Sequence, residues 1–345
     1  MRLPLFCPNP QCAHHHDKPG DYDKLWSYAG TYDTLVVGTV HRFKCLVCGK
    51  GFSERTFSIH YYTKKTIDLP ELHRALTQGE SLCSRLPLCE DLVADGFESF
   101  DGSQYFPNNI NILVGKYSQF LYGFTHTTIR RKGRMSDEQK ERRAALELRW
   151  KPPRGALVKD FATLLSYIAA HWDLSTRSSL ELWTDEHKAY PFAIDKVALL
   201  FHLLAQGLFR HSTVSSKLPR TILNPLFSVN YYDRELRKDI AAYRRESTCF
   251  GRNVTNGVMR FLLHLVYHNY QKLYRIKRND VDFVHAEVAG IPRKAISQAF
   301  EGFYLDRPFL SKVELTPYEK RLWLKKLTTP LKEKTEYVPK YARVA

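Results

Sequence analysis

Two pairs of closely spaced cysteines stand near the start of the chain. Cys7 and Cys12 frame Cys-Pro-Asn-Pro-Gln-Cys, and Cys45 and Cys48 frame Cys-Leu-Val-Cys. Four thiolates in two close pairs satisfy the tetrahedral preference of Zn²⁺, and the short loops let both sulfurs of a pair reach one ion. Gly49 permits the tight turn that directs backbone N–H groups toward the sulfurs. We therefore predict a structural zinc site in a small β ribbon.

Three consecutive histidines, His14 to His16, follow the first cysteine pair and are alternative zinc ligands. Because four cysteines already complete a closed tetrahedral site, we expect the histidines to stay outside it. A closed site leaves no position for a reacting water molecule. The zinc site is therefore predicted to be structural and not catalytic.

Two aspartates stand where short apolar segments end. Asp185 follows Leu-Glu-Leu-Trp-Thr, and Asp95 follows Leu-Val-Ala, ninety residues earlier. A carboxylate at the end of a buried strand is costly unless it meets water, a partner or a metal. For Asp185 alone, capping of the next helix is the favoured interpretation. If the two strands are neighbours, the carboxylates can instead bind Mg²⁺, and two such ions would support phosphoryl transfer.

A third candidate ligand lies on a helix predicted from about residue 229. Its apolar stripe consists of Leu236, Ile240 and Tyr243. At 100° per residue, Asn230, Asp233 and Arg237 fall on one flank of that stripe, and Glu235 falls on the other. One flank can face a metal pair, but both cannot. The alternative is an ordinary amphipathic helix with charged sides, in which Asp233 pairs with Arg237.

These residues require an α/β layer to position them. Apolar segments predict strands at 91–95, 111–115, 120–124 and 180–185, with helices from Ala156 and over 198–208. A strongly basic insert, 130–155, interrupts this layer, and Ser136-Asp-Glu-Gln opens a helix within it. Helices on the faces of such a sheet make an α/β fold.

Basic residues near these elements are candidate DNA contacts. The chain carries 52 Lys and Arg against 36 Asp and Glu, a net charge of +16, which favours a polyanionic partner. For the basic insert, a solvated charged surface is an equally good interpretation, and the ribbon residues could equally form a solvated edge. The candidates are Arg42, Lys44 and Arg55 in the ribbon, Arg130, Arg131, Lys132 and Arg134 in the insert, and Arg237.

The length of 345 residues suits two or three units. The chain has no apolar run of about eighteen residues, and its start has no apolar stretch of signal-peptide length. We therefore expect a cytoplasmic protein that has no membrane partner.

Four motifs in this order resemble one family, the bacterial insertion-sequence transposases of the RNase H-like, acidic-triad superfamily with an N-terminal zinc ribbon. The resemblance spans roughly residues 5 to 276. The motifs are the four-cysteine ribbon with Arg42-Phe-Lys-Cys and Phe52-Ser-Glu-Arg-Thr, Val93-Ala-Asp-Gly-Phe, Trp183-Thr-Asp-Glu-His-Lys-Ala-Tyr, and 230–245 followed by Cys249-Phe-Gly-Arg.

The resemblance implies a small β zinc ribbon, then an RNase H-like mixed sheet flanked by helices, then a helical C-terminal region. It makes Asp95 and Asp185 the first two catalytic acids and ligands of two Mg²⁺ ions. These ions promote attack of water, and then of a DNA 3′-hydroxyl, on a phosphodiester. Double-stranded DNA, both element ends and target, is the implied partner. A homo-oligomer associated with the bacterial nucleoid is expected.

This chain departs from the family pattern at the third acid. Relatives carry a Glu seven positions before a basic residue, and here Asn230 stands seven before Arg237. Asp233, one turn later on the same flank, is the favoured replacement, and Glu235 is the alternative on the other flank. A non-catalytic zinc-ribbon DNA-binding protein, either a decayed transposase or a regulator, is the alternative function.

The resemblance also predicts a domain organisation. Residues 1–60 form the ribbon, and 61–90 form a short helical connector in place of a complete helix-turn-helix. Residues 91–276 form the catalytic domain, including the insert 130–155, and 277–345 form a helical extension and tail.

Overall fold

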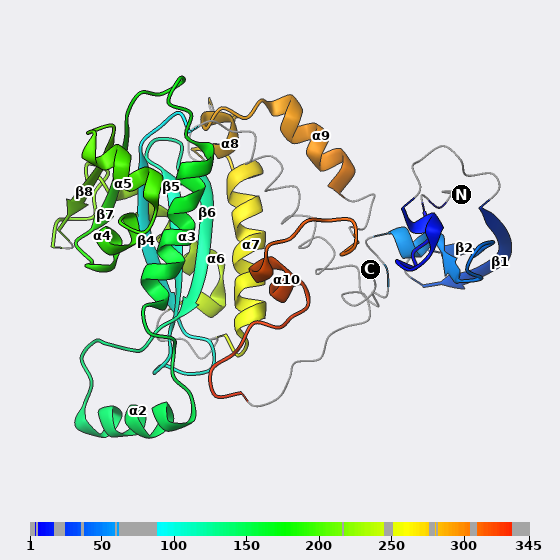
Figure 1. The fold of residues 1–345 in the computed structure, drawn as a ribbon, viewed down its shortest axis with the longest axis horizontal. Helices are drawn as coiled ribbons and strands as arrows, with labels where there is room; N and C mark the ends of the chain where they lie inside the picture. The colour runs from blue at the N-terminus through cyan, green and yellow to red at the C-terminus, as the bar shows by residue number, and fades with distance from the viewer. Residues whose placement is uncertain are drawn as a thin grey trace. The chain divides into compact units, whose positions relative to one another are not determined.

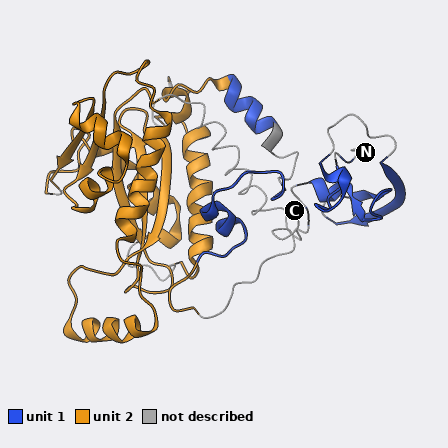
Figure 2. Cartoon of the chain, in the orientation of Figure 1, with its two compact units in different colours: residues 1–80, 294–327, 335–345 blue, residues 81–293, 328–334 orange. Residues whose placement is uncertain are grey.

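The chain folds into two compact units, coloured separately in Figure 2. Unit 1 comprises residues 1–80, 294–327 and 335–345, and unit 2 comprises 81–293 and 328–334. The computed structural model describes residues 4, 6–16, 25–35, 38–58, 61, 88–215, 217–244, 251–275, 280, 282–303 and 309–332. Most of the predicted connector 61–90 and the tail from 333 lie outside these residues. No helix in the described ranges is long and apolar enough to cross a membrane.

Unit 1 contains a small antiparallel sheet in the strand order β1-β2-β3. Its strands are β1 (Trp26–Thr34), β2 (Gly38–Cys45) and β3 (Gly51–Ser53), and short 3-10 helices lie at η1 (Ala13–His15) and η3 (Glu54–Phe57). Phe43, Phe52 and Phe57 build its core beside the cysteines. Phe309, far along the chain, completes that core and lies 5.6 Å from Phe57 between ring centroids. The ribbon is therefore completed by a C-terminal segment, which local sequence patterns did not predict.

Unit 2 is built on a five-stranded mixed sheet in the order β6-β5-β4-β7-β8 (Figure 1). Its strands are β4 (Leu92–Ser99), β5 (Asn108–Gly115), β6 (Leu121–Thr128), β7 (Leu180–Asp185) and β8 (Phe209–Val214). The first three form an antiparallel meander, and β7 and β8 extend it in parallel from β4. This strand order is consistent with an RNase H-like fold, so the predicted fold class is confirmed.

The segment from 198 to 214 differs from its prediction in two ways. The helix predicted over 198–208 is α5 (Ala198–Ala205), and the strand β8 that follows it was not predicted. The sequence of β8 is Phe-Arg-His-Ser-Thr-Val, and only its first and last residues are buried. An edge strand with a polar centre lacks the apolar alternation on which strand prediction depends.

Helices cover both faces of the sheet (Figure 1). On one face, α3 (Ala156–His171) packs on β5, β6 and α4 (Ala189–Ile194). On the other face, α6 (Phe227–Asp239) packs on β4 and β5, and α7 (Val254–Tyr270) lies beside it. The remaining helices are α2 (Asp137–Arg149), α8 (His285–Val288), α9 (Arg293–Phe303) and α10 (Pro317–Trp323). The site residues on β4, β7 and α6 are thus brought to one face.

Helix α6 ends at Asp239, earlier than the apolar stripe indicated. Ile240 is extended, with φ −111° and ψ 105°, and Tyr243 lies in the short helix η4 (Ala241–Tyr243). Both side chains still reach the core cluster that contains Leu236. The Tyr243 hydroxyl donates a 2.7 Å hydrogen bond to the Gly257 carbonyl, so this residue secures the segment after α6 against α7.

Three buried histidines join α7 and α8 behind α6. His268 and His285 stack with ring centroids 4.0 Å apart, and His264 lies 6.1 Å from His268. The Tyr232 ring of α6 lies 4.7 Å from His268. Burial lowers the pKa of all three histidines, to about 4 for His285, so they are neutral at pH 7.

We predict that unit 2 loses stability in mild acid because of this cluster. The folded pKa of His285 lies below its usual value of about 6.5, so its contribution is present above pH 6.5 and is lost toward pH 4. Between pH 7 and pH 5 this one residue should cost about 2 kcal/mol of unfolding free energy. Denaturant titrations at both pH values measure the loss.

His285→Asn is the matched variant, because its amide can still donate to the Ser118 carbonyl that now accepts from Nδ1. The variant should show a smaller fall in unfolding free energy between the two pH values. An equal fall would mean that His285 does not titrate as its burial requires.

Candidate functional site

The two candidate aspartates lie on adjacent parallel strands. Leu92 pairs with Leu182 and Val93 with Trp183, and this register, continued two residues further, sets Asp95 opposite Asp185. Side chains alternate along a strand, so both carboxylates lie on the face that carries Val93 and Trp183. That face is the one covered by α6.

Asp95 is held by two hydrogen bonds to the same carboxylate oxygen. The Gly96 backbone N–H donates to Oδ1 over 2.7 Å, and the Tyr190 hydroxyl donates to Oδ1 over 3.3 Å. Burial, and then the negative charge of Asp185, raise the pKa of Asp95 to about 6. The two carboxylates are therefore close enough to repel each other, and a cation between them would relieve that repulsion.

Asp185 does not cap the helix that follows it. Its Oδ1 accepts a 2.9 Å hydrogen bond from the His187 backbone N–H, which closes a turn, and the N-cap of α4 is Lys188. The capping interpretation of the sequence is therefore wrong. Among the described residues, no hydrogen-bond donor reaches Oδ2 of Asp95 or of Asp185. Each aspartate thus presents one carboxylate oxygen to which no residue of the described ranges donates.

Helix α6 runs along β4, with one flank toward that strand. Near its start, the Ser228 hydroxyl donates a 2.6 Å hydrogen bond to the Lys116 carbonyl, just after β5. Near its end, the Arg237 guanidinium lies 4.5 Å from the centroid of the Phe97 ring on β4. Asp233 stands one turn before Arg237, on the same flank of the helix. The flank that carries Asp233 therefore lies alongside the strand that carries Asp95.

Asn230 lies on the same flank as Asp233, one turn closer to the start of α6, and both side chains are half-buried. Glu235 has a different environment. Its buried carboxylate forms an ion pair with the buried ammonium of Lys272, and Lys238 lies 3.6 Å away. Burial raises the pKa of Glu235, but the hydrogen bond from Lys272 outweighs this and holds it below its usual value. Glu235 is thus already neutralised by the protein.

Two further residues at the site carried no assigned role in the sequence analysis. Tyr190, at the start of α4, is buried and contacts Asp95. The only feature of the sequence that could have indicated this residue is its place in the motif after Asp185. Arg220 is an exposed residue in the loop between β8 and α6, and its positive charge acts on Asp95, lowering the pKa of that carboxyl. A single basic residue in a loop gives no recognisable pattern in the sequence.

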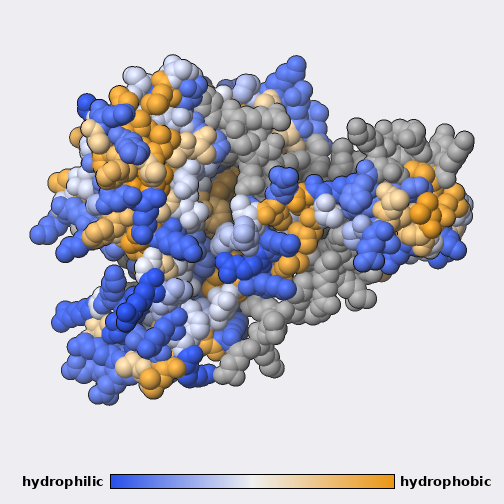
Figure 3. Space-filling view, viewed as in Figure 1, coloured by the Kyte–Doolittle hydropathy of each residue, from blue (hydrophilic) through white to orange (hydrophobic). Residues whose placement is uncertain are grey.

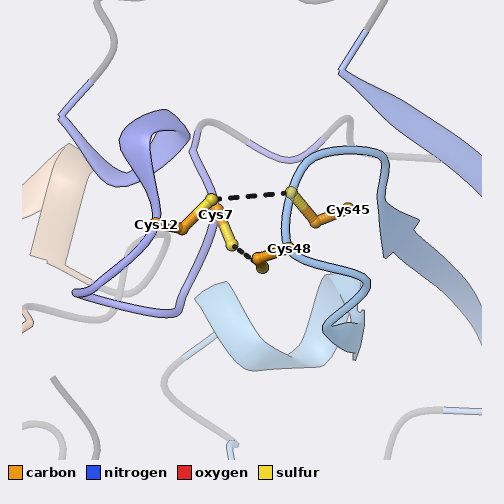
Figure 4. A group of neighbouring side chains, drawn as sticks. All are labelled: Cys7, Cys12, Cys45 and Cys48. Carbon is orange, nitrogen blue, oxygen red and sulfur yellow. Dashed lines mark hydrogen bonds between the residues drawn. The ribbon is translucent and has the colours of Figure 1, made fainter.

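The four cysteines come together as predicted (Figure 4). Their Sγ atoms all lie within 4.8 Å of one another, with Cys7 3.6 Å from Cys48 and Cys12 3.8 Å from Cys45. A tetrahedral Zn²⁺ with Zn–S bonds of about 2.3 Å separates its sulfurs by about 3.8 Å. Backbone N–H groups of Asn9, His14 and Lys50 also point at three of the sulfurs. The cluster is therefore consistent with structural zinc.

The histidines beside this cluster have other contacts. His15 is buried, and its Nδ1 lies 2.7 Å from the Cys7 carbonyl oxygen and its Nε2 2.8 Å from the Ser311 hydroxyl. It therefore ties the first cysteine loop to the C-terminal segment of unit 1. Nδ1 of His14 lies 3.9 Å from Sγ of Cys45, and the four sulfurs already suffice for a closed site.

The candidate DNA contacts lie in several environments. Arg42 and Lys44 are exposed and project from the same face of β2, whereas Arg55 is half-buried. In the insert, Arg130 forms a 2.5 Å ion pair with Glu147, and Arg131 bonds to Gln104 over 2.6 Å. Lys132 and Arg134 are exposed, and Arg237 stacks on Phe97 as described above.

Helix α2 forms the projecting part of the insert (Figure 1). It begins as predicted, with Ser136 and Gln139 in a capping box, and none of its residues is buried. Figure 3 shows mainly hydrophilic side chains over this arm. Most helices in proteins are stabilised by packing of one face, but α2 has no buried face. Its whole surface is therefore accessible to a partner.

Two carboxylates at adjacent strand ends, beside a helix with further oxygen ligands, suit a divalent metal ion. No protein-family model matches the chain, and no match is found among curated proteins or solved structures. A proposal for the function therefore has to rest on the residues of the site and their geometry.

The cysteine cluster predicts one tightly bound zinc per chain. Cys7→Ser should lose most of the zinc and expose the ribbon to proteolysis, because four ligands are needed to close the site. Native mass spectrometry of the full chain counts the metal. Cys89→Ser, which changes an exposed cysteine outside the cluster, should keep it. Equal zinc in the Cys7 variant would contradict the assignment.

The ion pair on α6 predicts a strong asymmetry between single and double variants. Lys272→Met leaves Glu235 buried without its main partner and should cost about 3 kcal/mol of unfolding free energy. Glu235→Leu combined with Lys272→Met removes both charges and should lie within about 1 kcal/mol of the unmodified protein. Urea denaturation measures both. If Lys272→Met is as stable as the unmodified protein, the ion pair does not stabilise the position of α6.

Proposed function

We propose that the protein is a DNA transposase of the RNase H-like, acidic-triad superfamily. It would cleave and rejoin phosphodiester bonds at the ends of an insertion sequence. One observation carries the proposal: Asp95 and Asp185 lie on the same face of adjacent parallel strands, and each presents an oxygen to which no described residue donates a hydrogen bond. The strand order of unit 2 and the sequence motifs around both aspartates support it.

In this proposal Asp95 and Asp185 hold the reacting centre through their Oδ2 atoms. Two Mg²⁺ ions, when bound there, would activate a hydroxyl and stabilise the leaving oxygen. The third ligand comes from α6, and Asp233 is the favoured residue, with Asn230 as a neutral oxygen ligand one turn away. Glu235 is disfavoured because Lys272 already neutralises it.

Double-stranded DNA is the proposed substrate, and exposed basic groups in each unit would contact its phosphates. In the ribbon these groups are Arg42 and Lys44, and in the α2 arm they are Lys132 and Arg134. Residues 130–155 contain ten Lys and Arg against four Asp and Glu, which supports contact with a polyanion. Arg220, whose positive charge acts on Asp95, would contact the phosphate that reacts. As the resemblance to insertion-sequence transposases implies, a homo-oligomer would hold both element ends.

A non-catalytic DNA-binding protein is the second candidate. It is favoured by Asn230, which stands where the family pattern has a glutamate and so removes one negative charge from the site. A binding protein needs only the ribbon and the basic arm. The two candidates differ in whether DNA is cut.

Strand cleavage tests the proposal directly. DNA spanning the ends of the element that encodes this chain should be nicked with Mg²⁺ or Mn²⁺, and Asp185→Asn or Asp95→Asn should reduce the rate at least about 100-fold by removing a metal ligand. Sequencing gels of end-labelled DNA measure the nicks.

Asp195→Asn is the matched control, since Asp195 is an exposed aspartate at the end of α4. It should leave cleavage unchanged. Undiminished cleavage by the Asp185 variant would refute the catalytic assignment. Salt-dependent DNA binding without any cleavage by the unmodified protein would favour the second candidate.

A further inference from the structure

Tyr190 connects the two elements that carry the aspartates. It stands five residues after Asp185, at the start of α4, yet its hydroxyl donates to Asp95 on the neighbouring strand. Its side chain is only 4% exposed. Its ring lies 4.4 Å from Phe161 of α3 and 5.7 Å from His187, measured between centroids. The ring is thus packed between α3 and the turn after Asp185, which fixes the position of the hydroxyl.

The hydrogen bonds at Asp95 distinguish its two carboxylate oxygens, because only Oδ1 accepts from the described donors. Both donors, the Gly96 N–H and the Tyr190 hydroxyl, meet Oδ1. Asp185 shows the same division, because the His187 N–H also meets Oδ1. A carboxylate with one oxygen held by donors cannot turn freely about its terminal bond, and its other oxygen keeps one direction.

We propose that Tyr190 is a positioning residue for the metal site, a role that rests on the proposed function. By holding Oδ1 of Asp95, its hydroxyl keeps Oδ2 directed for metal binding and couples the loop after Asp185 to β4. Donors behind ligating carboxylates generally orient the ligand, and their loss weakens metal binding by about 10- to 100-fold. Without the hydroxyl, Asp95 keeps only the Gly96 N–H as a hydrogen-bond donor among the described residues.

A purely structural role for Tyr190 makes a different prediction. The ring contacts with Phe161 and His187 remain in Tyr190→Phe, so a packing role predicts an unchanged protein. A positioning role predicts an unchanged fold but weaker metal binding, because only the hydroxyl is removed. The variant therefore separates the two.

The experiment is a calorimetric titration of Mn²⁺ into the zinc-loaded full chain without DNA. Tyr190→Phe should weaken Mn²⁺ binding about 10-fold or more while circular dichroism stays unchanged. In the cleavage reaction it should raise the Mn²⁺ concentration for half-maximal rate, and saturating Mn²⁺ should restore most of that rate. Tyr122→Phe is the control: Tyr122 is also buried, and its hydroxyl donates to Glu90, away from the aspartates.

Asp185→Asn in the same titration separates the two proposals. If Asp185→Asn weakens Mn²⁺ binding and Tyr190→Phe does not, the positioning role is overturned and the metal site stands. If the unmodified protein binds no Mn²⁺, or if Asp185→Asn leaves its Mn²⁺ binding unchanged, both the metal site and the positioning role are overturned. A Tyr122→Phe variant as weak as Tyr190→Phe would also overturn the positioning role.

Discussion

Repulsion between two carboxylates on adjacent strands is the constraint around which unit 2 is arranged. Asp95 and Asp185 share one face of the sheet, and burial, followed by the charge of Asp185, raises the pKa of Asp95 to about 6. A fold keeps such a pair only if nearby donors or cations offset the repulsion. Backbone N–H groups, Tyr190 and the charge of Arg220 do this in part. Divalent cations between the free oxygens would complete it, which is the basis of the proposed phosphoryl-transfer chemistry.

Helix α6 depends on a second set of buried polar groups. Val229, Tyr232 and Leu236 bury one stripe against the sheet, and the flank with Asn230 and Asp233 lies along β4. The opposite flank is held by the Glu235–Lys272 ion pair and by the histidines of α7 and α8. Buried ion pairs add little stability, but each partner needs the other, so a rotation of α6 that parted Glu235 from Lys272 would be costly. The orientation of the proposed third ligand would thus follow from groups on the opposite flank of α6, outside the proposed metal site.

Local patterns in the sequence were sufficient to predict the fold class, the cysteine cluster and the two strand-end aspartates. Strand-end aspartates, cysteine spacing and the capping box at Ser136 each depend on a few neighbouring residues. What the sequence did not predict depends on contacts between distant residues. Phe309 completes the ribbon core, Tyr190 reaches across to Asp95, and β8 is a strand because β7 offers it a partner. The helical wheel placed Glu235 on the opposite flank from Asp233, but only the fold reveals its pairing with Lys272.

Anomalous diffraction from crystals grown with Mn²⁺ tests the central claim most directly. Manganese peaks are expected beside Oδ2 of both Asp95 and Asp185, with a ligand from Asp233 or Asn230, and zinc is expected only among the four cysteines. Crystals that hold no manganese at the aspartates under saturating Mn²⁺ would contradict it. So would manganese bound to Glu235 with Lys272 displaced, because the ion pair would then not govern the orientation of α6.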